Sequence, residues 1–268
     1  MRKITNFLKK SLSVTTYKKL KNIYEIIKNP IQIGKKISYN LEKDKIYNDR
    51  IFESLNLNIE KIKQDLKNYN YDYSDPNLSW HYHLFAGLSQ NYKNINILEI
   101  GTSHGKFTNF LSNIFQKSNI ITCDLPQDSE EFKTAHNIKN KKELENFLIH
   151  RRNNLRNKNI KLLELDSVNL LNNFNNQKFD LIWIDGDHMD PQVSIDIYQS
   201  ITLTKPTGII CCDDILKYDE KMVKTSSDSF KTLNFLEEKN ILKNKFILKR
   251  INLDNAYFKK FICISRKC

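Results

Sequence analysis

Acidic residues follow several apolar segments in the middle of the chain. Asp124 ends "IITCD", Asp185 follows "FDLIWI", and the pair Asp213 and Asp214 follows "GIICC". If these segments are parallel strands, their carboxyl ends meet at one edge of a sheet, and the acids meet there too. Grouped carboxylates can hold a cation, accept hydrogen bonds or take up a proton. We therefore expect one site that combines ligand binding with catalysis.

A glycine turn precedes these acids. The stretch "ILEIGTSHGKF", residues 97–107, passes from a strand-like sequence through Gly101 and Gly105 into a helical one. A dinucleotide fingerprint, G-x-G-x-x-G, needs a glycine where Ser103 stands, which counts against NAD or FAD. The backbone N–H groups of such a turn, at the start of a helix, can receive an anionic group.

Strand-like and helical segments alternate from about residue 94, which is typical of a parallel sheet covered by helices. The apolar runs are 97–100, 119–123, 160–165, 179–184 and 208–212. Two more runs, 245–251 and 258–264, are joined by a short link and should pair antiparallel. We expect an α/β fold with a Rossmann-like, doubly wound, seven-stranded mixed sheet whose last strand is antiparallel.

The N-terminal part differs in charge and pattern. Residues 1–40 hold ten Lys or Arg and one acid, a net charge of +9, whereas the rest holds 33 basic and 30 acidic residues. Apolar positions at helical spacing in 4–28 predict a basic amphipathic helix or helix pair, and a second helical stretch spans 41–66. We expect an N-terminal basic helical extension over 1–78 and a catalytic domain over 79–268.

The turn E-x-G-x-x-x-G, with Asp124 ending the next strand, resembles the class I S-adenosylmethionine-dependent methyltransferases. The resemblance covers about residues 80–268. It implies that the turn holds the methionine part of the cofactor, that Asp124 binds the ribose hydroxyls, and that Asp166 and Ser167 in "ELDS" lie at the adenine. The implied cofactor-binding residues are Glu99, Gly101, Thr102, Ser103, His104, Gly105, Asp124, Asp166, Ser167 and Asp185.

The acids after the fourth and fifth strands look like those of metal-dependent O-methyltransferases of the sugar and natural-product type. That likeness implies that Asp185, Asp213 and Asp214 hold Mg²⁺, a hard cation that prefers oxygen ligands. The Asn/Asp-Pro-Pro-aromatic turn of the amine methyltransferases is absent after the fourth strand. His188 stands where catechol-type relatives carry a lysine base, so we expect His188 and Asp185 to be catalytic.

The resulting hypothesis is O-methylation of a hydroxyl on a small molecule or a glycan-borne sugar, with a vicinal diol as the acceptor best suited to chelation. An RNA methyltransferase is the alternative enzyme, although the near-neutral catalytic region argues against nucleic acid. A third possibility is a peripheral membrane or assembly-interaction protein that docks through residues 4–28. The five cysteines form no C-x-x-C pair, and the sequence has no long apolar run. We therefore expect a cytoplasmic protein, with the inner face of the membrane as a further location. Acceptor identity and homo-oligomerisation stay open.

Two further segments have alternative interpretations. Trp80, His81 and His83 in "LSWHYHLF" could line an acceptor pocket or pack in the core. The long connection 125–158 carries a cluster of three arginines, Arg151, Arg152 and Arg156, which could bind an anionic acceptor or form a solvated helix.

Overall fold

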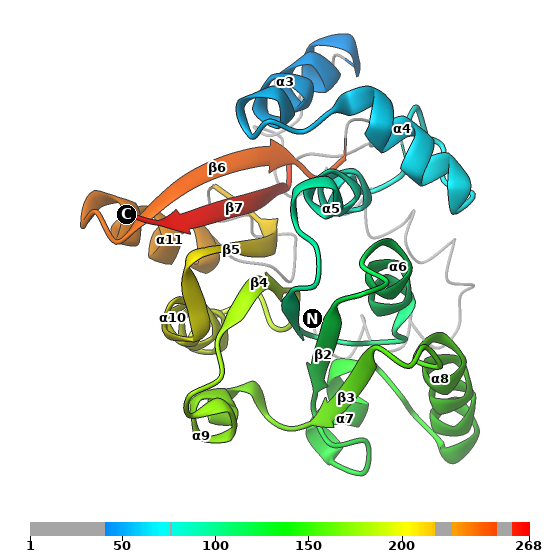
Figure 1. Ribbon diagram of the computed structural model, residues 1–268. Coiled ribbons are helices and arrows are strands. Elements are labelled where there is room, and N and C mark those ends of the chain that lie inside the picture. The colour runs from blue at the N-terminus through cyan, green and yellow to red at the C-terminus, as the bar shows by residue number, and fades with distance from the viewer. Residues whose placement is uncertain (1–40, 76, 218–226, 251–258) are drawn as a thin grey trace, which may run out of the picture. The chain divides into compact units, whose positions relative to one another are not determined.

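The computed structural model describes residues 41–75, 77–217, 227–250 and 259–268. The predicted basic helix at 4–28, and with it the proposed membrane contact, lies outside these residues. Within the described residues the chain builds a single sheet with helices on both faces (Figure 1).

The sheet has seven strands in the order β3-β2-β1-β4-β5-β7-β6. Strands β1 to β5 are parallel, and β7 runs antiparallel to both β5 and β6, so the predicted mixed sheet is confirmed. Chain order reverses beside β1, because β2 and β4 flank it. This is the point where open α/β sheets bind ligands. The strands are β1 (Asn96–Ile100), β2 (Asn119–Asp124), β3 (Ile160–Glu164), β4 (Phe179–Ile184), β5 (Thr204–Ile215), β6 (Leu242–Leu248) and β7 (Phe261–Lys267).

Strand β6 lies three residues earlier in the sequence than the predicted run 245–251, and β7 lies three residues later than the predicted run 258–264. The link between these two strands is therefore longer than predicted. Leu242 pairs with Lys267 at one end of the ladder, and Leu248 pairs with Phe261 at the other. The apolar run located these strands in the sequence. Their limits, however, come from cross-strand register, and buried Leu242 packs in the same core as α11. The structure also places β6, rather than β7, at the sheet edge.

Helices cover the sheet in two groups. They are α3 (Leu41–Ser54), α4 (Ile59–Asn68), α5 (Trp80–Asn91), α6 (Lys106–Ile114), α7 (Glu130–Ala135), α8 (Lys141–Asn154), the 3₁₀ helix η2 (Ser167–Asn169), α9 (Leu170–Phe174), α10 (Gln192–Leu203) and α11 (Asp228–Glu238). The stretch 41–66, predicted as one helical region, forms two helices. Asn56 in between has a left-handed φ of 57°, and Asn58 caps α4 by accepting from Lys61 N.

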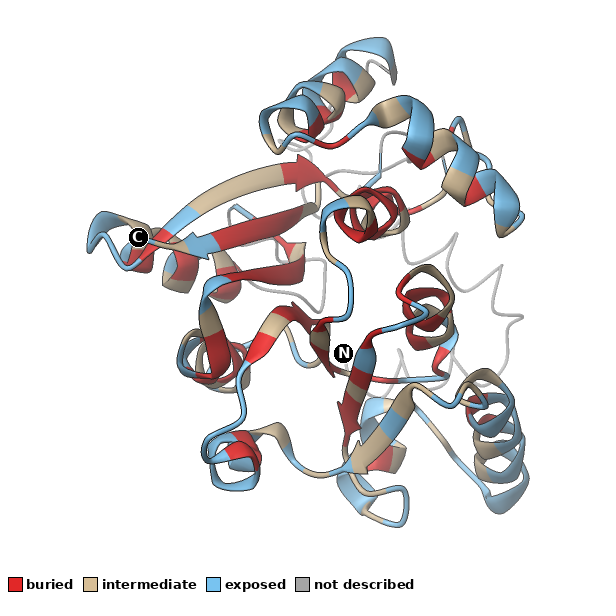
Figure 2. Ribbon diagram, viewed as in Figure 1, coloured by how far each residue is buried: buried red, intermediate tan, exposed pale blue. Residues whose placement is uncertain are grey.

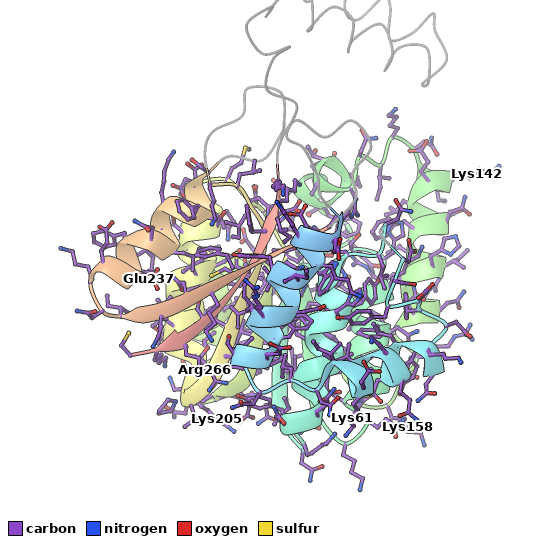
Figure 3. All side chains as sticks on the ribbon, turned by 90° about the horizontal axis from the view of Figure 1, so that it is seen from above. Lys61, Lys142, Lys158, Lys205, Glu237 and Arg266 are labelled. Atoms are coloured by element: carbon purple, nitrogen blue, oxygen red, sulfur yellow. The ribbon has the colours of Figure 1, made fainter. Side chains whose placement is uncertain are left out.

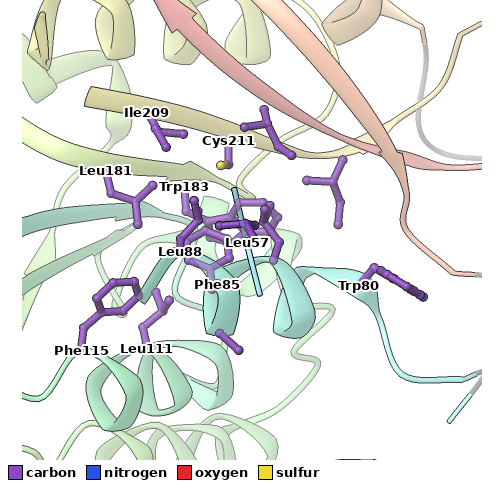
Figure 4. Close-up of a cluster of buried hydrophobic side chains, with 14 of the residues drawn as sticks. Leu57, Trp80, Phe85, Leu88, Leu111, Phe115, Leu181, Trp183, Ile209 and Cys211 are labelled. Atoms are coloured by element: carbon purple, nitrogen blue, oxygen red, sulfur yellow. The ribbon is translucent and has the colours of Figure 1, made fainter. Parts of the chain in front are cut away.

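Alternating strand residues feed two hydrophobic cores, as expected for a sheet buried on both faces. Ile97, Trp183 and Cys211 belong to one core, together with residues of α3, α4, α5 and α6 (Figure 4). Leu98 and Cys212 belong to the other, with α9, α10 and α11. Figure 2 shows buried residues on the strands and exposed ones on the outer faces of α3, α4 and α8. Helices α3 and α4 thus share a core with the sheet, while the division of the chain at residue 78 stays a prediction.

Charged side chains lie on the surface of the described part of the chain. Figure 3 shows labelled examples from several elements, including Lys61, Lys142 and Glu237, at its periphery. None of the helices in the described part of the chain combines the length and apolar character that crossing a membrane requires.

Trp80 and His83 lie in the core, and their stacked rings have centroids 4.4 Å apart. The core interpretation of these two residues therefore holds.

Candidate active site

The ends of β1 and β4 interlock at Gly101. Asp185 N donates to Ile100 O at 2.8 Å, and Gly101 N donates to Cys123 O at 2.8 Å. Gly101 has φ +99°, and a Cβ there would lie 2.2 Å from Asp185 O. Only glycine fits, because a side chain would strain the backbone and collide with the neighbouring turn. The glycine thus allows three strand ends to converge around one cavity.

The rest of the glycine turn leads into α6. Gly105 caps the helix in the left-handed region, with φ 71°, and a Cβ there would lie 2.7 Å from Leu155 Cδ2. Gly105 therefore lets the end of α8 pack against the turn. His104 is exposed and lies against Phe147, with ring centroids 4.0 Å apart. These two predicted cofactor residues shape the turn from its α8 side.

Asp124, at the end of β2, is buried in a network of donors. Its Oδ2 accepts from Ser103 N at 2.8 Å and from Arg151 Nη2 at 2.6 Å, while Oδ1 accepts from Leu125 N at 2.9 Å. His136 Nε2 lies 3.4 Å from Oδ1. Two backbone N–H groups and a guanidinium together fix the orientation of this carboxylate.

Glu99 and Thr102 lie behind the turn, away from the cavity. Glu99 Oε2 accepts from Thr108 Oγ1 at 2.5 Å and from Thr122 Oγ1 at 2.6 Å, which ties α6 to β2. Thr102 is buried and contacts Thr122 Oγ1 at 2.6 Å. Burial raises the pKa of Glu99 to about 7, and the two hydroxyl donors only partly counter this. Both side chains therefore act on the scaffold of the turn.

A cavity of about 560 Å³ opens beside this turn, at the carboxyl ends of β1, β2 and β4. Seven of the predicted site residues line it: Gly101, Ser103, Asp124, Asp166, Ser167, Asp185 and His188. Six others do not: Glu99, Thr102, His104, Gly105, Asp213 and Asp214. The cavity thus joins the predicted cofactor residues to the predicted catalytic pair.

Asp166 and Ser167 form the far wall, after β3. Asp166 Oδ1 accepts from Val168 N at 3.1 Å and caps η2, while Ser167 Oγ accepts from Gln192 Nε2 at 2.7 Å. The first bond holds the local backbone, and the second joins Ser167 to the start of α10. Gln192, at the start of α10, also lines the cavity.

Asp185 and His188 occupy the near wall, in the turn after β4. His188 Nε2 lies 3.7 Å from Asp185 Oδ1 and 3.8 Å from Asp214 Oδ2, and the imidazole side chain is 17% exposed. Burial lowers the pKa of His188, which outweighs the nearby acids and favours the neutral ring. Burial, with Asp213 beside it, raises the pKa of Asp185. The pair offers a proton acceptor at the cavity wall.

Asp213 and Asp214 lie next to this pair but contact lysines. Lys249 Nζ is 2.5 Å from Asp213 Oδ2 and 2.5 Å from Asp214 Oδ1, and Lys260 Nζ also pairs with Asp214. Burial alone would raise the pKa of Asp214, but the two ammonium groups outweigh it and lower the pKa. Neighbouring strand residues normally point to opposite faces. Here the register with β7 shifts between Cys212 and Ile215, and Asp214 has φ 53°, so both carboxylates reach Lys249.

The structure brings the three predicted Mg²⁺ ligands together, yet their arrangement does not fit a divalent cation. The ammonium of Lys249 already bridges two of the three carboxylates. Among the described residues, no three His, Cys, Asp or Glu side chains form a group that could hold a metal. The Mg²⁺ site stays a sequence-based prediction.

The connection 125–158 forms a wall of the cavity. Glu131 and Ala135 of its helix α7 and His136, which directly follows that helix, contribute to the lining, and α8 packs beside α6. Arg151 is 2% exposed, whereas Arg152 and Arg156 are exposed, so the three arginines do not form a single anion-binding patch.

Sequence reasoning missed the roles of Arg151, Lys249 and Lys260. Arg151 was grouped with exposed arginines, although it lies four residues after the buried Phe147 on the same helical face. Lys249 and Lys260 lie inside the runs predicted as strands, 245–251 and 258–264, whereas the structure places Lys249 just after β6 and Lys260 just before β7. The sequence pattern therefore did not indicate that these lysines would meet the acids after β5.

Comparisons with known proteins agree with this architecture. A family model described as "Methyltransferase domain" matches residues 98–215. The cofactor-bound Rv0187 from MTB superposes with a TM-score of 0.52 at 16% identity, over 69% of this chain and 78% of that one, which supports the fold. The O-methyltransferase TomG from Streptomyces achromogenes gives a TM-score of 0.47 at 14% identity, covering 84% and 98% of the two chains. An O-methyltransferase from Bacillus cereus gives 0.47 at 18%, covering 85% and 100%. No curated protein matches the sequence.

The sheet order, the glycine turn and the acid after β2 agree with a class I methyltransferase domain, and the methyltransferase family model covers residues 98–215, which hold the turn and most of the cavity. These findings support the recognition made from the glycine turn, that of an S-adenosylmethionine-dependent methyltransferase.

Proposed function

We propose that the protein transfers the methyl group of S-adenosylmethionine to a hydroxyl of a small molecule or a glycan-borne sugar. One observation carries the proposal. Asp185 and His188 line the same cavity as Gly101 and Asp124, so a proton acceptor lies next to the predicted cofactor residues. A hydroxyl acceptor needs such a group because it must lose its proton as it is methylated.

The cofactor roles follow from the cavity walls. We infer that the ribose hydroxyls bind Asp124, whose orientation is fixed by the Ser103 N–H and by Arg151. Asp166 and Ser167 would hold the adenine, and the turn at Gly101 would hold the methionine part, because all three residues line the cavity. Asp185 and His188 would then be the residues beside the methyl group that the cofactor supplies.

The chemistry needs one displacement and one proton transfer. The acceptor oxygen attacks the methyl carbon, a C–O bond forms, and the C–S bond breaks with its electron pair left on sulfur. The products are a methyl ether and S-adenosylhomocysteine. The hydroxyl proton passes to neutral His188, and the carboxylate of Asp214, 3.8 Å away, stabilises the resulting imidazolium. The cavity contributes by holding oxygen, carbon and sulfur in line.

The charge distribution favours a small or sugar acceptor over RNA. Residues 41–268 hold 33 basic and 30 acidic side chains, so this part of the chain lacks the strong positive charge that phosphate binding needs.

The basic segment 1–40 supports a second proposal, that the protein contacts the anionic inner face of a membrane. We also propose that the N-terminal extension ends at residue 78. A cytoplasmic location and the formation of a homo-oligomer also stay predictions from the sequence.

Calorimetry with S-adenosylhomocysteine tests the cofactor site. We expect binding by the wild-type protein and its loss in Asp124→Ala. In Asp128→Asn, an exposed acid in the following turn, binding should be unchanged. An assay of S-adenosylhomocysteine release with phenols, catechols, sugars and RNA then identifies the acceptor class. Absence of cofactor binding would refute the proposal, and turnover only with RNA would replace it with the alternative enzyme.

A further inference from the structure

A largely buried cluster of opposite charges lies behind the wall formed by Asp185 and His188. Lys249 bridges Asp213 and Asp214, and Lys260 pairs with Asp214. The exposed fraction of these side chains runs from 1% for Asp213 to 23% for Lys260. Ion pairs this far from solvent are held in one arrangement, unlike flexible surface pairs.

The backbone fixes the position of the bridging lysine. Lys249 N donates to Lys260 O at 2.9 Å, which sets the two lysines opposite each other beyond the ends of β6 and β7. Trp80 N, at the start of α5, donates to Lys249 O at 2.8 Å. Lys249 is therefore held from two directions, and its side chain extends to the end of β5.

We propose that Lys249 is the resident cation of this site and that methyl transfer proceeds without a bound divalent metal. The inference rests on the proposed function and replaces the metal of the sequence-based prediction. A divalent cation at Asp213 and Asp214 would have to displace an ammonium that contacts both carboxylates. The two lysines also balance the charges of these two acids, so no further cation is needed for neutrality.

This arrangement changes the expected acceptor. A vicinal diol is favoured when two of its oxygens chelate a metal, whereas an ammonium cannot chelate in that way. With Lys249 as the cation, the acceptor needs a single hydroxyl that reaches His188. Lys249 then acts as a positioning residue, because it holds Asp213 and Asp214 in place beside the catalytic pair.

Titration with Mn²⁺, followed by electron paramagnetic resonance on the full-length protein with and without S-adenosylhomocysteine, tests the proposal directly. The wild-type protein should bind Mn²⁺ no more tightly than on the order of 1 mM, the weak end of protein sites for divalent cations. Lys249→Met should bind it at least about tenfold more tightly, because the two carboxylates lose their ammonium. Lys249→Arg, which keeps the charge, and Lys243→Met, which changes an exposed lysine on β6, should behave like the wild type.

Tight Mn²⁺ binding by the wild type that disappears in Asp213→Asn would overturn the proposal. So would turnover that stops in chelator and returns with Mg²⁺. If Lys249→Met does not fold, the wild-type titration and the chelator experiment still decide. Failure of the proposed function would show separately, as absence of S-adenosylhomocysteine binding in calorimetry.

Discussion

The guanidinium of Arg151 joins the glycine turn to the acid after β2. Its Nη2 donates to Asp124 Oδ2 at 2.6 Å and its Nε donates to Ser103 O at 2.7 Å. The group lies against the rings of Phe132 and Phe147, with centroids 4.7 and 5.0 Å away. A residue of the long connection 125–158 therefore sets the orientation of the carboxylate proposed to bind the ribose.

Arg151→Lys should weaken cofactor binding while leaving the fold intact. Lysine keeps the charge but lacks the fork that reaches Asp124 and Ser103 together. We expect a loss of about tenfold in S-adenosylhomocysteine affinity, or about 1.4 kcal/mol, measured by calorimetry. Arg152→Lys is the matched control, since Arg152 is exposed and donates to Leu148 O of its own helix. Equal affinity in both variants would show that Arg151 does not position Asp124.

His188→Gln should slow methyl transfer without affecting cofactor binding. Glutamine keeps polar atoms at the cavity wall but cannot take up the acceptor proton. We expect kcat to fall by about 10²–10⁴, as for the loss of a general base. Turnover with an acceptor from the screen and calorimetry with S-adenosylhomocysteine measure the two effects. His150→Gln, on the exposed face of α8, serves as the control. An unchanged kcat in His188→Gln would exclude the imidazole as the base.

Glu99 should make the protein less stable as pH rises. Its pKa is raised from 4.5 to about 7 in the folded protein, so folding favours the protonated form. The associated stability is complete below about pH 4.5 and is lost as pH rises through about 7. The difference amounts to about 3 kcal/mol at 1.36 kcal/mol per pKa unit. Glu99→Gln should therefore melt at a higher temperature than wild type at pH 8 and at a similar one at pH 5. The same difference in melting temperature at both pH values would contradict this assignment.

Gly101→Ala should destabilise the domain. Its Cβ would meet Asp185 O at 2.2 Å while φ is +99°, so the ends of β1 and β4 must separate. We expect a loss of at least about 2 kcal/mol in urea unfolding, together with weaker cofactor binding. Gly186→Ala is a close control in the same cavity, because its nearest Cβ contact would be 3.6 Å. Equal stability of the two variants would show that the interlocked turns are not required.

Local patterns in the sequence were sufficient for the fold and for much of the site. Apolar runs identified all seven strands, and the glycine turn with the acids after β2 and β4 identified the residues around the cavity. These signals are local because strand burial, turn conformation and helix capping depend on neighbouring residues. Acids at the ends of parallel strands meet because the strands share one direction, which the alternation of elements already implies.

Only the tertiary structure decided which charges pair. Lys249 meets Asp213 across 36 residues of sequence, and Arg151 meets Asp124 across 27. The first pair depends on the register of β7 against β5 and on the irregularity at Asp214, and the second on the packing of α8 against the glycine turn. No periodic pattern encodes these contacts, since a charged residue has the same local signature whether it meets a metal, a lysine or water. The sequence therefore located the acids, and the fold selected their counter-ions.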